Sequence, residues 1–374
     1  MVWIPRTENE RADYLSRIID SDDWAISEFV FQIVESLWGP HEAFAGELQN
    51  LPVSLLSKVN LLPELLSESR AASTTKGYYQ SFLRWKKWAI LNGIENCDIL
   101  PAKAFHVAIY LASLTQSSNT ASPVVQAFYS LKWIHSLIGS LCSPTDSSLV
   151  INVLESAKRS LATPTNKKEP ISVELLHKMY DAMFSFGNLY NQHIICACFT
   201  TFAVFLRVSE MLNIRSSDIV ILECYVSILI QHSKTDVYRD GNSVLIARTH
   251  SNKCPVKNME LYLQWADISC DSDEFIFRNL TKCKDAYVLR KENTPLSYSR
   301  MRELFIEAFK PFVHNIKRYG LHSLRSGGAS VCANLGLPDR LFKRHGRWRS
   351  ETAKDGYVKD SLEDLLIVSK NLGL

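Results

Sequence analysis

Between residues 63 and 161 the hydrophobic positions recur with the period of a helix. In GYYQSFLRWKKWAILNG (77–93), Tyr78, Phe82, Trp85 and Ala89 follow one another at spacings of four, three and four residues. These spacings place them on one face of a helix. The stretches AKAFHVAIYLASL, VVQAFYSLKWIHSLIG and SSLVINVLESAKRSL show helical patterns of the same kind. This part of the chain is therefore predicted to be a bundle of helices.

A polar stretch, LATPTNKKEPIS (161–172), ends the helical part. Its two prolines, two threonines and lysine pair are typical of a solvated linker. We place a domain boundary here, which gives a helical domain over 61–165 and a second domain over 166–374. The segment 1–60 has a different, acidic composition and forms a separate appendage.

The second domain mixes two periodicities. SVELLHKMYDAMFSF and HIICACFTTFAVFLRVSEML (193–212) are predicted helices, the second continuous and largely buried. IVILECYVSILIQHSK and NSVLIART are β-branched runs that predict a small antiparallel sheet, with Lys234 close to its turn. Helical patterns resume in PVKNMELYLQWAD, in SRMRELFIEAFKPFV and from Leu324 onward. The expected fold class is mostly α with a small antiparallel β-sheet: a helical domain, then a mixed α+β domain.

Composition narrows the class of protein. The chain of 374 residues is 46% hydrophobic and 22% charged, as in ordinary globular proteins. It has no run of eighteen apolar residues, so no membrane span is expected. The polar N-terminus resembles neither a signal peptide nor a transit peptide. The nine cysteines stand mostly apart, and we expect buried, reduced thiols in a cytosolic or nuclear protein rather than a disulfide framework.

The net charge of +3 is unevenly distributed. Residues 1–60 hold 4 Lys/Arg and 10 Asp/Glu, a balance of −6, and the remaining 38 basic and 29 acidic residues give +9. A basic body of this kind is compatible with a polyanionic partner such as nucleic acid.

Four stretches of the second domain carry candidate chemistry, although each is weak alone. They are FLRVSEML with Arg207, SKTDVYRDG with Lys234, LHSLRSGGAS, and GRWRSETAKDGYV. In the third, His322 and Arg325 stand three apart and point the same way on a helix. The glycine pair that follows them, Gly327 and Gly328, is costly in a helix unless another element approaches closely.

Taken in order, these residues resemble the tyrosine recombinase superfamily over residues 65–374. The set is Arg207, Lys234, His322, Arg325, Trp348 and Tyr357, with spacings of 23 and 9 residues between the last three. The SKTD and GRW motifs are most similar to the eukaryotic mobile-element branch. With the RNase H-like segment described below, the chain most resembles the recombinases of DIRS-like retrotransposons. The resemblance implies a core-binding, SAM-like helical domain over 61–165 and a catalytic domain over 166–374.

The chemistry of this family suits these residue types. Arg207 and Arg325 would supply planar guanidinium forks to the non-bridging oxygens of a DNA phosphodiester. Tyr357 would be the nucleophile that forms a covalent 3′-phosphotyrosyl bond. Since a phenol ionises only near pH 10, it needs a base or hydrogen-bond donor, for which His322 is the candidate.

The remaining roles are also implied by the resemblance. Lys234 would protonate the leaving 5′ oxygen. Trp348 would donate its indole N–H to the phosphate, and Glu210 would orient a basic partner. No metal or other cofactor is expected, because the fixed cations carry the charge. The family usually has glycine two residues before the first arginine, where this chain has Phe205.

The helical domain would clamp double-stranded DNA together with the catalytic domain. The candidate phosphate contacts are Lys76, Arg84, Lys86, Lys87, Lys132 and His135. Tyr79 and Trp133 are expected in the core. The C-terminal SLEDLLIVSKNLGL is amphipathic and would either cap its own domain or dock on a neighbouring protomer of a homo-oligomer, a tetramer on DNA. The expected compartment is the nucleus, or the cytoplasm before import.

The acidic segment 1–60 has a resemblance of its own. WIPRTENERADYLSR followed by LWGPHEAFAGELQN looks like the end of a retroelement RNase H domain and its connector, with Asp13 as the last carboxylate of that site. The other carboxylates of a two-metal nuclease would lie before Met1, so this remnant is expected to be inert.

Two alternatives from other functional classes stay open. The chain could be a catalytically silent DNA-binding protein derived from a mobile element. It could also relax DNA like a type IB topoisomerase, with the same chemistry and no second DNA site.

Overall fold

A computed structural model of the chain describes residues 69–137, 143–164, 167–231, 233, 241–284 and 286–372, together with single positions between 52 and 66. The chain divides after Thr165 into two compact units. The proposed RNase H remnant, with Asp13, lies outside the described residues. Lys234 lies outside them as well.

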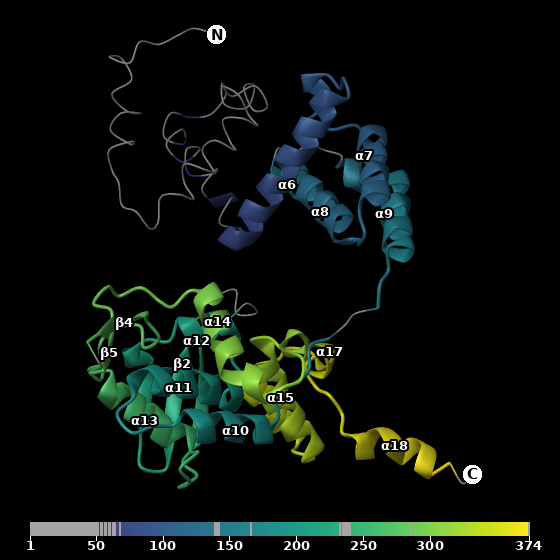
Figure 1. Ribbon diagram of the computed structural model, residues 1–374. Coiled ribbons are helices and arrows are strands. Elements are labelled where there is room, and N and C mark those ends of the chain that lie inside the picture. Colours follow the sequence, from purple (N-terminus) through teal and green to yellow (C-terminus); the bar gives the residue numbers. More distant parts are fainter. Residues whose placement is uncertain are drawn as a thin grey trace, which may run out of the picture. The chain divides into compact units, whose positions relative to one another are not determined.

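The first unit is built from helices, as its hydrophobic pattern predicts. Figure 1 shows α6 (Ala72–Leu91), α7 (Ala104–Ser117), α8 (Ser122–Leu137) and α9 (Ser148–Ser160), with 3-10 turns at Asn96–Asp98 and Pro144–Asp146. Trp85 is fully buried at the centre of the core, and its indole N–H donates to the Ile99 carbonyl at 3.1 Å. Tyr79 and Trp133 are buried too, which confirms their place in the core.

The second unit combines helices with two small sheets. Its α-helices are α10 (Val173–Met183), α11 (Leu189–Ala203), α12 (Val208–Leu212), α13 (Pro255–Trp265), α14 (Tyr298–Phe309), α15 (His322–Asn334), α16 (Asp339–Gly346), α17 (Glu351–Asp355) and α18 (Leu362–Lys370). Its 3-10 turns are Ser216–Asp218, Lys310–Phe312 and Ile316–Arg318. The largest hydrophobic cluster of the described residues lies in this unit, around α11, α13 and α14.

The expected antiparallel sheet is confirmed. It has the order β1 (Ile219–Ile221), β2 (Tyr225–Ile230), β3 (Asn242–Ala247), and its second pairing runs from Tyr225 opposite Ala247 to Ile230 opposite Asn242. A second antiparallel pair, β4 (Leu280–Cys283) with β5 (Ala286–Leu289), was not predicted.

The prediction of one continuous helix over 193–212 is wrong. Helix α11 ends at Ala203, Phe205 takes a left-handed backbone conformation with φ 52°, and α12 begins only at Val208. The new helix start is stabilised by Glu210, whose carboxylate accepts the backbone N–H of Arg207 at 2.8 Å. Arg207 therefore stands at a sharp corner between two helices and not inside one.

The glycine pair of α15 allows the close approach that the sequence predicted. A Cβ added at Gly327 would lie 2.1 Å from the Ile171 carbonyl oxygen, and one added at Gly328 would lie 2.3 Å from the Phe202 carbonyl oxygen. Helix α15 can thus pack directly on the backbone before α10 and on the end of α11. This packing brings Arg325 to the corner that carries Arg207.

The cysteines only partly match the expectation of burial. The eight described cysteines are free, but only Cys196, Cys198 and Cys254 are buried, while Cys97, Cys224, Cys270 and Cys283 are exposed. Within the part of the chain that is described, no helix combines the length and apolarity required to cross a bilayer.

One core residue makes the stability of the second unit depend on pH. His193 is buried against the rings of Tyr262 and Phe277, at centroid distances of 5.4 and 5.6 Å, and neither of its ring nitrogens has a hydrogen-bond partner among the described residues. Burial lowers the pKa of His193 from 6.5 to about 4. The folded state therefore holds a neutral imidazole where the unfolded chain takes up a proton.

We expect the free energy of unfolding to fall as the pH is lowered from 6.5 to 4, because only the unfolded state binds the proton in this range. The loss at pH 4 attributable to His193 is about 3 kcal/mol. Denaturant unfolding of the wild type and of His193→Phe at neutral pH and near pH 4 measures it, since phenylalanine keeps the ring stack and does not titrate. An equal loss of stability in both proteins would contradict the prediction.

Candidate active site

A single buried carboxylate organises the predicted catalytic residues. The Glu210 side chain is 1% exposed and faces three arginines: its oxygens lie 2.6 Å from Arg207, 2.9 Å from Arg347 and 3.7 Å from Arg325. Burial raises the pKa of Glu210, but the three guanidiniums and the Arg207 backbone N–H outweigh it, and the pKa lies below its ordinary value. Glu210 is thus an anion, and it orients basic partners as the sequence predicted.

The Arg207 guanidinium is hydrogen-bonded within the protein through one terminal nitrogen, and its side chain is partly exposed. Its Nη1 donates to Glu210 at 2.6 Å and to the Ser233 hydroxyl at 2.8 Å. Its side chain is 12% exposed. Because Nη1 makes both of these bonds with the described residues, Nε and Nη2 are the donors that can reach an external anion.

Arg325 is completely buried, and its guanidinium lies against the rings of Trp348 and Tyr357. It donates to the carbonyls of Phe205 and, at 2.9 Å, of Gly346. Its guanidinium carbon lies 5.0 Å from the ring centroid of Trp348 and 4.7 Å from that of Tyr357. Burial, followed by repulsion from Arg207, lowers the pKa of Arg325 to about 10, so it remains a cation at neutral pH.

Trp348 has an indole N–H without a partner. The side chain is 5% exposed, and its Nε1 finds no hydrogen-bond acceptor among the described residues. Its ring lies against Gly346, where an added Cβ would come within 1.8 Å of it. A buried N–H left unpaired is costly, which favours a role as donor to an acceptor from outside the chain.

Tyr357 is placed by a short helix that an ion-pair cluster ties down. Its ring is half-buried, 5.8 Å from that of Trp348, and its backbone N–H donates to the Lys354 carbonyl at 2.9 Å. The buried Lys354 ammonium pairs with Asp339 at 2.6 Å and with Glu351 at 2.8 Å. These bonds raise the pKa of Lys354 far above its ordinary value and link α17 to the start of α16.

The other two predicted residues are His322 and Lys234. His322 is the first residue of α15, one turn before Arg325, and its side chain is exposed. Lys234 is not described, but its neighbour Ser233 accepts a hydrogen bond from Arg207. The structure thus brings Arg207, Arg325, Trp348 and Tyr357 together and puts His322 on the same helix as Arg325.

Phe205 occupies the position where the family usually has glycine. Its φ of 52° lies in the left-handed region that glycine adopts without strain. The phenyl ring packs 4.8 Å from that of His345 and 5.9 Å from that of Trp348, in a small cluster that also includes Phe342. This packing holds the strained residue, and the carbonyl of Phe205 faces Arg325.

Arg347 is a site residue that the sequence reasoning missed. It contacts Glu210 and lies between Gly346 and Trp348 in the GRW motif. The signal in the sequence was its place beside Trp348, but nothing there shows that the side chain turns inward.

Five of the six candidate DNA contacts in the first unit are exposed or half-buried, and the sixth is buried. Lys76, Arg84 and Lys87 lie on one exposed face of α6, Lys86 is half-buried, and Lys132 is exposed with its ammonium 3.4 Å from Asp146. His135 is wrong as a DNA contact, because it is only 1% exposed. Its Nε2 accepts the Ala102 N–H at 2.9 Å and its Nδ1 lies 2.7 Å from the Leu131 carbonyl.

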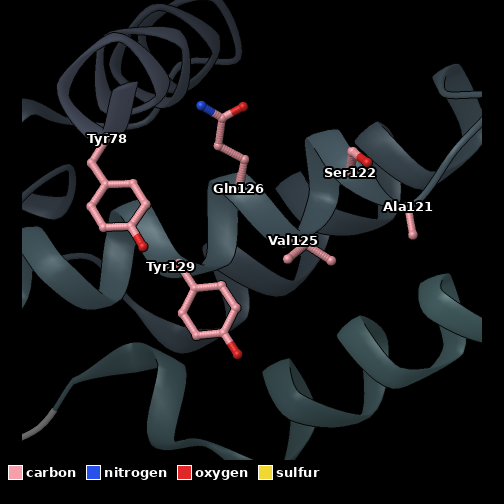
Figure 2. Close-up of a pocket in the computed structure, with 6 residues that line it drawn as sticks. All are labelled: Tyr78, Ala121, Ser122, Val125, Gln126 and Tyr129. Carbon is pink, nitrogen blue, oxygen red and sulfur yellow. The ribbon is translucent and has the colours of Figure 1, made fainter. Parts of the chain in front are cut away.

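A pocket of about 470 Å³ lies in the first unit, on α6 and α8 and the residue before α8 (Figure 2). It is lined by Tyr78, Ala121, Ser122, Val125, Gln126 and Tyr129. None of these side chains carries a charge at neutral pH, so this pocket does not offer the cations that phosphodiester chemistry needs.

The sequence and the structure of this chain both resemble those of known recombinases and integrases. No family model matches the chain. Over 298 aligned residues the chain is 24% identical to an integrase/recombinase XerD homolog of Selenomonas ruminantium. The aligned region covers 79% of this chain and 83% of the relative.

Two solved structures resemble it over most of its length. The XerH site-specific recombinase bound to a palindromic difH substrate in a post-cleavage complex has a TM-score of 0.57, with 13% identity over 93% of this chain and 94% of that one. A lambda integrase tetramer bound to a Holliday junction has a TM-score of 0.50, with 14% identity over 91% and 88%. The chain therefore has the fold of the tyrosine recombinase/integrase superfamily.

Proposed function

We propose that this chain is a site-specific DNA recombinase that cleaves and rejoins DNA through Tyr357. The observation that carries the proposal is the stack of Tyr357 and Trp348 on the buried Arg325, whose counter-ion Glu210 also holds Arg207. A nucleophile, an unpaired N–H donor and two guanidiniums thus meet at one place. These are the groups that phosphoryl transfer to a phenol requires.

The reaction follows from the chemistry of these groups. The Tyr357 oxygen attacks the phosphorus and gives up its proton, for which His322 is the acceptor. The bond from phosphorus to the 5′ oxygen breaks, and the leaving oxygen takes a proton that we assign to Lys234. Arg207 and Arg325 neutralise the non-bridging oxygens, and Trp348 donates its N–H to one of them. Attack by a 5′ hydroxyl on the phosphotyrosine reverses these steps and rejoins DNA.

The DNA-binding role of the first unit is part of the same proposal. Lys76, Arg84 and Lys87 share one exposed face of α6, as a row of phosphate contacts would. With Lys86 and Lys132 they remain candidate contacts, and double-stranded DNA is the proposed partner. The structural comparison supports this proposal, since both of the solved structures described above hold DNA.

We also propose a homo-oligomer on DNA, in which α18 docks on a neighbouring protomer. Leu362, Leu365, Ile367 and Leu372 are 70%, 62%, 52% and 61% exposed, so α18 does not cap its own unit. Apolar side chains at such exposure favour a partner. A tetramer is the proposed form, in line with the tetramer described for lambda integrase.

Origin and compartment complete the proposal. The SKTD and GRW motifs favour a eukaryotic mobile element, and the resemblance of residues 1–60 to an inert RNase H remnant favours descent from a DIRS-like retrotransposon, with action in the nucleus. A reverse transcriptase reading frame upstream of the gene would support this origin, and a different upstream gene would contradict it.

Covalent capture tests the function and selects the DNA site in the same experiment. The full chain is incubated with a pool of nicked duplexes that have a randomised core, and protein–DNA adducts stable in SDS are isolated, sequenced and mapped by peptide mass. We expect attachment at Tyr357 and enrichment of one DNA motif. DNA retention in a gel shift without any adduct would instead support a silent DNA-binding protein. Relaxation of a plasmid that lacks the motif by the monomer would support a topoisomerase.

A further inference from the structure

Arg347 has a backbone conformation that its residue type disfavours. With φ 56° it lies in the left-handed region, at the turn that follows α16 and precedes Trp348. Every residue with a Cβ is strained there, whereas glycine is not. Strained positions of this kind persist where the surroundings fix them, and they cluster at functional sites.

Both terminal nitrogens of the Arg347 side chain are hydrogen-bonded within the protein. Its Nη1 donates to the carbonyls of Val204 at 3.0 Å and His345 at 3.2 Å, and its Nη2 donates to the Phe205 carbonyl at 3.2 Å and to Glu210 at 2.9 Å. Only 5% of the side chain is exposed. Because both terminal nitrogens already have two acceptors each, Arg347 presents no fork to a phosphate.

Three of these four bonds join the two segments that carry the catalytic groups. Val204, Phe205 and Glu210 belong to the corner that presents Arg207, and His345 belongs to the turn that presents Trp348. The Phe205 carbonyl is shared, because Arg325 also donates to it. Two left-handed residues that are not glycine, Phe205 and Arg347, are therefore bonded to each other next to both predicted phosphate ligands.

The competition for Glu210 shows what Arg347 prevents. Glu210 Oε2 lies 2.9 Å from Arg347 and 3.7 Å from Arg325. This oxygen also accepts the Arg207 backbone N–H. Without Arg347 it would have room for a second donor, and could draw the Arg325 guanidinium toward itself and away from the rings of Trp348 and Tyr357. We propose that Arg347 is a positioning residue for strand cleavage: it occupies Glu210 and the Phe205 carbonyl and so keeps Arg207 and Arg325 aimed at one phosphate. This inference rests on the proposed function.

The test uses the full chain and a nicked duplex that carries the motif captured by the wild type. The variants are Arg347→Gly, which suits the left-handed backbone, Glu210→Gln, and both together. Arg349→Ala is the matched control, because Arg349 is an exposed arginine two residues away. Three quantities are measured for each protein: the single-turnover rate of adduct formation, the Kd for DNA, and the Tm.

We expect Arg347→Gly to slow adduct formation roughly 30-fold, as the loss of a supporting contact does elsewhere. Its Kd should stay within about threefold of the wild type, because Arg347 does not reach the DNA. Its Tm should fall, because buried carbonyls and Glu210 lose a partner and glycine offsets only part of this loss by relieving the strain, so rate and Kd are measured well below that Tm. The double variant should be no slower than the slower single variant, because both residues act through the same contact. Arg349→Ala should cleave at the wild-type rate.

Three results would overturn the role of Arg347. The first is a rate of adduct formation by Arg347→Gly within threefold of the wild-type rate. The second is a loss of DNA affinity as large as the loss of rate. The third is a double variant whose fold-loss in rate equals the product of the two single fold-losses. A wild-type protein that forms no adduct overturns the proposed function and this inference together. Failure of the inference alone is thus recognised by an active wild type.

Discussion

Replacing Tyr357 with phenylalanine is expected to abolish the covalent protein–DNA adduct and leave the affinity for DNA unchanged. The phenyl ring keeps its contacts, 4.7 Å from the Arg325 guanidinium and 5.8 Å from the Trp348 ring. Only the attacking oxygen is lost. Loss of a nucleophile typically costs more than about 10⁴-fold in rate, so no adduct should be detectable in single-turnover assays.

The hydroxyl of Tyr357 has no hydrogen-bond partner among the residues that the structure describes, so its removal should not destabilise the fold. Tyr298→Phe is the matched control, because Tyr298 is an exposed tyrosine at the start of α14. That variant should form the adduct at the wild-type rate. Persistence of the adduct in Tyr357→Phe would point to a different nucleophile, and a large loss of DNA affinity would point to a binding role for the hydroxyl.

The periodicity of the sequence predicted most helices and the main sheet because each buries one continuous face. Phe82, Trp85 and Ala89 are buried along α6 as their spacing predicts, whereas Tyr78, the fourth residue of that predicted face, is only half-buried. The same reasoning failed at residues 204–207. The apolar run continues through Phe205 without glycine or proline, so nothing in the pattern marks the left-handed residue that turns the chain there.

The candidate site could be predicted where residues match, in order, the set of the tyrosine recombinases that the chain resembles. Arg207, Arg325, Trp348 and Tyr357 were found in this way. Arg347 was missed because its partners are mostly backbone carbonyls, which no sequence pattern reveals. The role of such a residue depends on tertiary contacts alone.

His135 shows the opposite error. Its basic ring next to Lys132 suggested a phosphate contact, yet it stands four residues after Leu131 and so falls on the buried face of α8. Burial lowers the pKa of His135, which keeps the ring neutral and able to accept the Ala102 N–H. The helical spacing contained the correct signal, and the residue type outweighed it.

Replacing Arg325 with lysine is expected to slow adduct formation by roughly 10³-fold, although lysine has the same formal charge as arginine. Arg325 is fully buried and spans the Phe205 and Gly346 carbonyls while its face lies on the two aromatic rings. One ammonium cannot reproduce this planar fork. A lysine buried beside Arg207 would also tend to lose its proton, since desolvation and like charge both lower a lysine pKa. The loss of one oriented donor to the transition state has an effect of this size.

The electrostatic origin of this loss can be separated from misfolding by changing the substrate. A methylphosphonate at the cleavage site replaces one charged oxygen by a methyl group, so less charge needs neutralising and the ratio of wild-type to Arg325→Lys rates should shrink. Arg302→Lys, at an exposed position of α14, is the matched control and should keep the wild-type rate on both substrates. A ratio that is unchanged on the neutral substrate would mean that Arg325 supports the fold of the site and does not neutralise the phosphate.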